Sequence, residues 1–139
     1  NLIVTKNTKL IIERFINILP LFMCMKISKE DLLRINQGFG GNLRSDSSID
    51  FAIEKINDAK LGFYTKLAYL WRAILVDHPF SDGNKRTATE TMRLFIETNG
   101  FSINAAMNGM VYISLKIANN EMNTRELSHW IFERLGEKK

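Results

Sequence analysis

Apolar residues recur at helical spacing along most of the chain. Side chains three and four positions apart share one face of an α-helix, so this spacing predicts amphipathic helices. Residues 111–113 are also compatible with a strand, but the flanking residues Met110 and Ile117 fit helical spacing better. We therefore expect an all-α fold, a compact helical bundle. The predicted helices cover residues 5–19, 28–36, 49–57, 61–76, 84–98, 108–118 and 124–135.

Polar residues mark the expected ends of these helices. Ser28 and Asp31 match the capping box, in which each side chain bonds the backbone N–H of the other residue. Asn123 and Glu126 repeat this pattern. Residues 99–100, Asn-Gly, form a normal helix stop. Candidate caps for the remaining helices are Ser48 or Asp50, Asn84 and Asn108.

The helices over residues 61–76 and 84–98 are the most core-like of the set. The first is apolar on nearly every side, which is typical of a helix in the middle of a bundle. The second carries a stripe of apolar residues expected to be buried: Ala88, Met92, Phe95 and Ile96. We therefore expect the short segment that joins them to lie on a rigid support, as a preorganised site requires.

The composition indicates one globular domain. The chain has 139 residues, of which 45% are hydrophobic and 24% charged, so we expect a single domain over residues 1–139. The net charge of +4 is compatible with binding of nucleotides or nucleic acid and diagnostic of neither. A single cysteine, Cys24, excludes an internal disulfide framework and a cysteine-based zinc site.

The apolar stretches do not indicate a membrane protein. The longest, residues 15–25, is interrupted by Asn17 and Pro20 and is too short to span a bilayer. Glu13 and Arg14 interrupt the region in which a secretory signal would lie. We therefore expect a cytoplasmic protein without a membrane partner.

The segment between the two core-like helices concentrates chemically active side chains. Its nine residues are His78-Pro79-Phe80-Ser81-Asp82-Gly83-Asn84-Lys85-Arg86. Pro79 cannot continue the preceding helix and moves His78 out of the helical region. Gly83 permits a tight turn, and Asn84 is a favoured N-cap for the next helix. This predicts a loop that leads into a helix N-terminus, which is a ready site for anions.

Each polar side chain of this segment has a chemical use. The imidazole of His78 can accept a proton near neutral pH. Asp82 offers the hard carboxylate oxygens that Mg²⁺ prefers beside phosphates. Lys85 and Arg86 can neutralise phosphate oxygens, and the bulky apolar Phe80 is suited to anchor the loop in the core. Together these are the components of group transfer from a nucleotide phosphate.

Arg86 also fits a second interpretation. It begins a series with Glu90, Arg93 and Glu97, spaced by four, three and four residues, which is typical of an ion-paired helix face in solvent. For Arg86 alone this surface role is favoured. The agreement of all the other positions of the segment favours the active-site role.

The segment resembles the active-site motif of the Fic/Doc family. The residues that carry the resemblance are His78, Pro79, Phe80, Asp82, Gly83, Asn84 and Arg86, seven of the nine positions. Lys85, where most Fic enzymes have glycine, together with Thr87 and Ala88 is closer to the Doc (death on curing) branch. The resemblance implies a compact helical fold that transfers AMP or phosphate from a nucleotide to a protein hydroxyl, with ATP or another nucleotide and Mg²⁺ as cofactors.

The resemblance assigns a role to the polar residues of the motif. His78 would deprotonate a Ser, Thr or Tyr hydroxyl of the target protein. Asp82 would hold Mg²⁺ against the nucleotide phosphates. Gly83 and Asn84 would shape the anion-binding turn, the asparagine also bonding a phosphate oxygen. Arg86 would stabilise charge on the transferred or leaving phosphate.

Lys85 bears on the reaction subtype. A bulky cation in place of glycine narrows the space beside the phosphates and adds charge there. In the Doc branch this accompanies an inverted nucleotide and transfer of the terminal phosphate, whereas the Fic branch transfers AMP (AMPylation). We expect Doc-like phosphorylation, by a kinase that is the toxin of a toxin–antitoxin pair, with AMP transfer as the alternative.

A glycine-rich segment, residues 36–44, precedes the motif and lacks a helical pattern. A plain connecting loop is the common case, and the segment does not match a P-loop. Fic and Doc proteins carry a flap ahead of the motif, a short loop or hairpin that holds the target segment by backbone pairing, and residues 38–45 lie where it should fall. The candidate flap residues are Gly40, Gly41, Asn42 and Leu43.

The resemblance also bears on partners. Many Fic proteins carry an inhibitory helix with Ser or Thr, three residues, then Glu and Gly or Asn, and no segment of this chain matches it. This implies an inhibitor in trans, such as an antitoxin, or a segment outside this chain. The rival interpretation is a non-catalytic module that binds nucleotide or nucleic acid. Against it, the cations are scattered and no nucleic-acid-binding motif is present, so nucleic acid is not expected as a partner.

Overall fold

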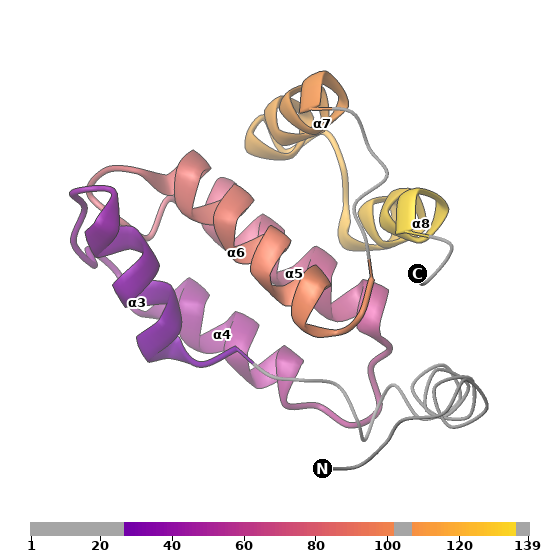
Figure 1. Cartoon of the computed structure of the whole chain (residues 1–139), viewed down its shortest axis with the longest axis horizontal. Coiled ribbons are helices and arrows are strands. Elements are labelled where there is room, and N and C mark those ends of the chain that lie inside the picture. The colour runs from indigo at the N-terminus through magenta and orange to yellow at the C-terminus, as the bar shows by residue number, and fades with distance from the viewer. Residues whose placement is uncertain (1–26, 102–106, 136–139) are drawn as a thin grey trace, which may run out of the picture.

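The structure, a computed structural model, describes residues 27–101 and 107–135. Every named element over these residues is a helix, and no strand is present among them (Figure 1), which confirms the predicted all-α fold. The helix expected over residues 5–19 lies outside the described residues, as does Cys24. The described helices are α3 (Lys29–Gly38), α4 (Ser47–Ile56), α5 (Phe63–Leu75), α6 (Asn84–Thr98), α7 (Met107–Ala118) and α8 (Thr124–Leu135).

Helix α5 forms the centre of the bundle. It packs against α4, α6, α7 and α8, and α3 packs against α6 and α4. Figure 1 shows α3 and α4 on one side of the α5–α6 pair and α7 and α8 on the other. Among the described helices, none combines the length and the apolar character that crossing a bilayer needs.

The central position of α5 follows from its sequence. Leu67, Leu70 and Ile74 are fully buried, and Trp71 is 1% exposed. Burial of each such side chain contributes about 1.5–3 kcal/mol to folding, which explains why this helix lies inside the bundle. Lys66 is buried as well, which the apolar pattern did not predict. The stripe expected on α6 is buried as predicted: Ala88, Met92, Phe95 and Ile96.

Two helices begin with the capping boxes that the sequence predicted. At α3, the Asp31 N–H donates to Ser28 Oγ at 3.1 Å, and the Ser28 N–H donates to Asp31 Oδ2 at 3.0 Å. At α8, the Glu126 N–H donates to Asn123 Oδ1 at 2.8 Å, and the Asn123 N–H donates to Glu126 Oε1 at 3.2 Å. Each box satisfies N–H groups near the start of the helix.

The caps expected for α4 and α7 were wrong. Helix α4 begins before both expected caps, so Ser48 and Asp50 lie inside its first turn, and Asp46 at the N-cap makes no side-chain capping bond. Lys29 of α3 engages these carboxylates instead, because its Nζ lies 2.8 Å from Asp46 Oδ1 and 2.8 Å from Asp50 Oδ1. These bonds raise the pKa of Lys29 above its usual range and tie α3 to α4. Asn108 lies within α7 and does not precede it.

Replacing Ser28 by alanine removes the oxygen that accepts the Asp31 N–H. We expect Ser28→Ala to lower the free energy of unfolding by about 1 kcal/mol, measured by urea denaturation. Ser47→Ala is the matched control, because Ser47 Oγ meets the exposed hydroxyl of Ser45 at 3.3 Å and caps no helix. A change within about 0.5 kcal/mol is expected for the control. Equal losses in the two variants would contradict the capping role.

Asp31 should make the stability depend on pH. Hydrogen bonds from the backbone and side chain of Ser28, with a smaller effect of Arg34, lower the pKa of the Asp31 carboxyl. Because the folded pKa is lowered, the carboxylate stabilises the fold above its unfolded pKa of about 4, and this contribution is lost as the pH falls through the folded pKa. Wild type and Asp31→Asn should therefore differ in unfolding free energy at neutral pH and converge in acid. A difference that stays constant down to about pH 2 would refute this account.

Candidate active site

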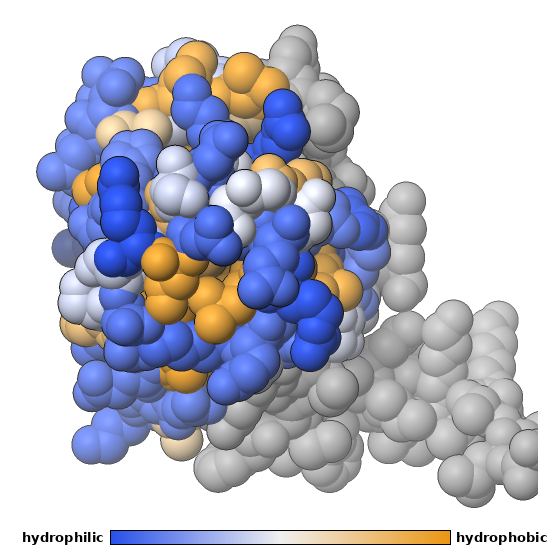
Figure 2. Space-filling model, turned by 90° about the vertical axis from the view of Figure 1, so that its left-hand side faces the viewer, coloured by the Kyte–Doolittle hydropathy of each residue, from blue (hydrophilic) through white to orange (hydrophobic). Residues whose placement is uncertain are grey.

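The motif segment lies in the loop between α5 and α6, at one end of the bundle (Figure 1). Figure 2 shows this end, which is mainly hydrophilic with apolar patches between. A hollow of about 350 Å³ lies beside the segment. Its lining consists of Phe39, His78, Ser81, Asp82, Gly83, Asn84, Lys85 and Arg86. The structure thus brings together all the polar residues of the motif that the sequence singled out, and adds Phe39, which it did not.

A larger hollow of about 560 Å³ lies beside α5 and α8. Three polar side chains of its lining have partners: Glu126 belongs to the capping box of α8, Ser128 meets Thr65 of α5 at 3.4 Å, and His129 pairs with Glu133 at 3.0 Å. The side chain of His129 is exposed. The hollow beside the motif is therefore the better candidate site.

The N-terminus of α6 lies in the lining of the motif hollow. Gly83 is the N-cap residue and has φ +72°, a left-handed conformation that glycine adopts at little cost. The first helical hydrogen bond runs from the Thr87 N–H to the Gly83 oxygen at 2.8 Å. Within the described residues, the N–H groups of Asn84, Lys85 and Arg86 meet no acceptor. These donors, at the positive end of the helix dipole, can bind an anion.

Asn84 does not cap α6, contrary to the prediction. It is the first helical residue, and its side chain turns back to the main chain of Phe80. The Phe80 N–H donates to Asn84 Oδ1 at 3.0 Å, and Asn84 Nδ2 donates to the Phe80 oxygen at 2.9 Å. Phe80 itself is 1% exposed, so burial and two hydrogen bonds both fix the loop. A bond from Asn84 to a phosphate would use the remaining hydrogen of its amide.

Asp82 is exposed, and one of its two oxygens is engaged. Oδ1 accepts the Gly83 N–H at 2.7 Å, which orients the carboxylate. The described residues contain no group of three or more His, Cys, Asp or Glu side chains that could enclose a metal ion. Mg²⁺ binds through one or two carboxylates and keeps several waters when phosphates complete its shell. A lone Asp82 therefore fits Mg²⁺ held together with a nucleotide.

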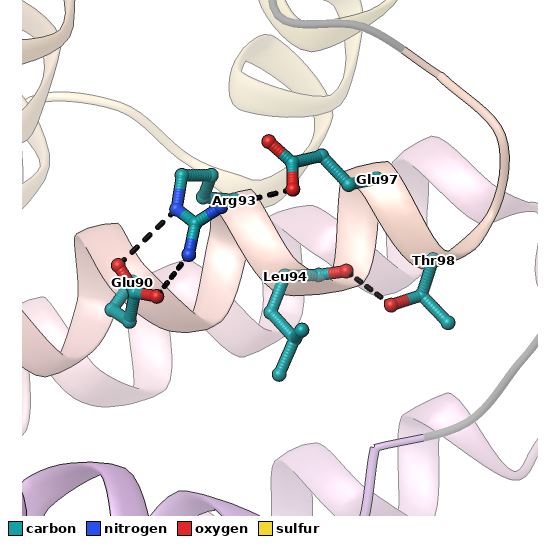
Figure 3. Close-up of polar contacts among 5 residues, drawn as sticks. All are labelled: Glu90, Arg93, Leu94, Glu97 and Thr98. Carbon is teal, nitrogen blue, oxygen red and sulfur yellow. Dashed lines mark hydrogen bonds and ion pairs between the residues drawn. The ribbon is translucent and has the colours of Figure 1, made fainter.

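Arg86 and Arg93 lie on the same helix and differ in their contacts. Arg93 bonds Glu90, and its Nη1 lies 2.9 Å from Glu97 Oε2 (Figure 3). These bonds lower the pKa of Glu90 and raise that of Arg93. Arg86 makes no ion pair with any residue in the described part of the chain, and it lines the hollow. The structure thus separates Arg86 from the ion-paired series that the spacing suggested.

The main chain of His78 is strained. Its φ of +48° lies in the left-handed region, which costs a non-glycine residue about 1–2 kcal/mol. As predicted, His78, which precedes Pro79, does not adopt the right-handed helical conformation. Residues before proline are usually extended, however, whereas His78 is left-handed. Strain of this kind concentrates at functional sites. The exposed His78 side chain lines the hollow.

The candidate flap lies directly against the motif. The Ser81 N–H donates to the Asn42 oxygen at 2.8 Å, and the Arg44 N–H donates to the Pro79 oxygen at 2.7 Å. Between these bonds, Leu43 and Phe80 form an isolated antiparallel bridge. Leu43 and Phe80 are thus a non-hydrogen-bonded antiparallel pair, in which the N–H and C=O of each residue point away from the other residue. Leu43 therefore presents one main-chain donor and one acceptor on the side away from Phe80.

Asn36, near the end of α3, is a site residue that the sequence did not single out. It is 1% exposed, and its Nδ2 donates to the Asp82 oxygen at 2.8 Å and to Thr87 Oγ1 at 3.0 Å. A β-carbon on Gly41 would overlap both the Asn36 side chain and the Asp82 oxygen. Asn36 and Gly41 thus pack the flap against the motif. No local pattern could reveal this, because the partners of Asn36 lie 46 and 51 residues along the chain.

Comparison with known proteins supports the resemblance to the Fic/Doc family. The family model described as Fic/DOC family matches residues 26–96 of the chain. The matched region contains α3 to α5 and most of α6, and with them the motif, the flap and Asn36. No curated protein matches the chain.

We expect Gly41→Ala to disturb the motif and Gly38→Ala to leave it intact. A methyl group at position 41 would displace Asn36 or the main chain of Asp82, and overpacking of this kind costs about 1–3 kcal/mol of unfolding free energy. At position 38 the methyl group meets no atom within 4 Å. Urea denaturation and the amide NMR shifts of the motif measure the two effects. Two variants of equal stability with wild-type motif shifts would contradict this packing.

Proposed function

Because the chain belongs to the Fic/DOC family, we propose that it transfers the terminal phosphate of ATP to a Ser, Thr or Tyr hydroxyl of a target protein. Members of this family carry out nucleotide-dependent transfer of a group to a target. The observation that carries the proposal is the hollow in which His78, Asp82, Lys85 and Arg86 meet the N-terminus of α6.

In the proposed reaction His78 takes the proton of the target hydroxyl. As the bond from that oxygen to the γ-phosphorus forms, the bond from the γ-phosphorus to the β–γ bridging oxygen breaks. ADP leaves with the electron pair of the broken bond, and His78 returns its proton to solvent. The exposure of His78 and its place in the lining of the hollow support this role.

The positive groups around the hollow are suited to the charge of this reaction. Phosphoryl transfer needs little covalent chemistry from the protein and depends on positioning and charge stabilisation. The N–H groups at the start of α6 are donors already held in place, and the exposed side chains of Lys85 and Arg86 line the same hollow. Preorganised donors need no reorganisation when charge develops, so they stabilise the transition state more than solvent does.

Asp82 would hold the Mg²⁺ of the nucleotide. When bound, the ion neutralises charge on the phosphates. The contribution of the chain is the orientation of the carboxylate, which the bond from the Gly83 N–H to Oδ1 provides. No residue in the described part of the chain bonds the second oxygen, which is therefore available for a cation.

Lys85 favours transfer of phosphate over transfer of AMP. Its exposed side chain lines the hollow next to Gly83, so it adds both volume and a charge where glycine would leave space. This is the feature in which the motif resembles the Doc branch. Lys85 thereby supports a nucleotide whose terminal phosphate, and not its α-phosphate, lies next to His78.

The flap supports a protein as the target. An extended peptide can add to an exposed main-chain edge, where backbone hydrogen bonds supply affinity. The outward N–H and C=O of Leu43 are such an edge, and they lie one residue from main-chain groups bonded to the motif. A target segment paired at Leu43 would lie close to the hollow.

Intact mass after incubation with ATP, Mg²⁺ and a cell lysate tests the proposal. We expect a gain of one phosphate on a target or on the protein itself, and a rate about 10²- to 10⁴-fold lower for His78→Ala. His129→Ala is the matched control and should keep the wild-type rate, because His129 lies on α8 and pairs with Glu133.

Other outcomes would point elsewhere. A His78-dependent gain of one AMP would reject phosphate transfer and establish AMP transfer. Full activity of His78→Ala would reject His78 as the base. Salt-dependent binding of DNA or RNA without any adduct would favour a binding module.

A further inference from the structure

The strained main chain of His78 needs support from outside the dipeptide. Its φ of +48° is unfavourable for histidine, and the following Pro79 has no N–H to donate. Hydrogen bonds that hold this dipeptide must therefore act mainly on its two carbonyl oxygens. Arg44 and Ser45 of the flap bond both of them.

Arg44 makes two of these bonds. Its Nη2 donates to the His78 oxygen at 2.9 Å, and its main-chain N–H donates to the Pro79 oxygen at 2.7 Å. The Ser45 N–H also donates to the Pro79 oxygen, at 3.1 Å. The bond from the guanidinium is assisted by its charge, so it is stronger than a neutral hydrogen bond.

We propose that Arg44 is a positioning residue for His78. Its guanidinium holds the left-handed main chain of His78 and thereby fixes where the imidazole lies in the hollow. Arg44 is not among the residues that line the hollow, so it acts through His78. This inference rests on the proposed function, in which His78 is the base.

The histidine content of the chain allows a direct test. The chain has two histidines, His78 and His129, so replacing either one assigns both imidazole signals in ¹H–¹³C NMR spectra of the full chain. Arg44→Met keeps the aliphatic stem and removes the donor. We expect it to shift or broaden the His78 Cε1–H signal and to leave the His129 signal unchanged. Arg34→Met, at another exposed arginine, is the matched control and should leave both signals unchanged.

Kinetics supply the second readout. Displacement of a reacting group by about 1 Å can reduce a rate by about 10²-fold, so we expect Arg44→Met to lower kcat by about 10- to 100-fold. The KM for ATP should change by less than about 2-fold, because the phosphate-binding residues are unaltered. A rise in the KM for ATP with an unchanged kcat would contradict a role through His78.

The two readouts separate failure of this inference from failure of the proposed function. Wild-type His78 signals in Arg44→Met, or a shifted signal with wild-type kcat, would overturn the positioning role. If the wild-type chain transfers no group, the proposed function fails, and the NMR comparison still shows whether Arg44 holds His78. If Arg44→Met unfolds, seen as a changed His129 signal, Arg44→Gln replaces it. Glutamine removes the charge and keeps a donor, so the same changes are expected at smaller size; their absence would overturn the inference.

Discussion

The main chain of the motif loop has no regular structure, and the site depends on how its polar groups are satisfied. Buried or half-buried N–H and C=O groups need partners, and a loop cannot supply them through helical hydrogen bonds. Here the partners come from outside. Helix α6 holds Phe80 through Asn84. Helix α3 holds Asp82 through Asn36, and the loop between α3 and α4 holds Pro79. Three separate segments thus determine one loop conformation.

Within a few residues, the buried groups that anchor the loop are separate from the exposed side chains of the candidate site. Pro79 and Phe80 are buried and belong to the core that α5 and α6 build. His78, Asp82 and Arg86 are exposed on the same loop and helix start. The side chains of the candidate site can therefore face solvent while their main chain is fixed by packing. Sites built on rigid elements keep their geometry better than sites on free loops.

The sequence predicted features that depend on near neighbours and missed those that depend on distant ones. The capping box joins Ser28 and Asp31, which are three positions apart, and the bounds of α6 were predicted as found. The cap of α4 was wrong, because Lys29, 21 positions before Asp50, engages that carboxylate. Asn36 was missed for the same reason. The roles of the motif residues came from resemblance, and the family match over residues 26–96 supports the resemblance as a whole.

The close approach of Gly41 to Asn36 and the Asp82 oxygen bears on protein engineering. The nine-residue motif alone does not contain all the residues that hold its main chain. Grafted between two helices of a different bundle, it would arrive without the α3 amide and without the glycine that lets the flap main chain approach it. Among the described residues, the groups that bond the main chain of the motif loop lie between the start of α3 and the end of α6. A cut between α3 and α4 would divide the loop whose main chain bonds Pro79, whereas a cut between α7 and α8 would leave these bonds intact.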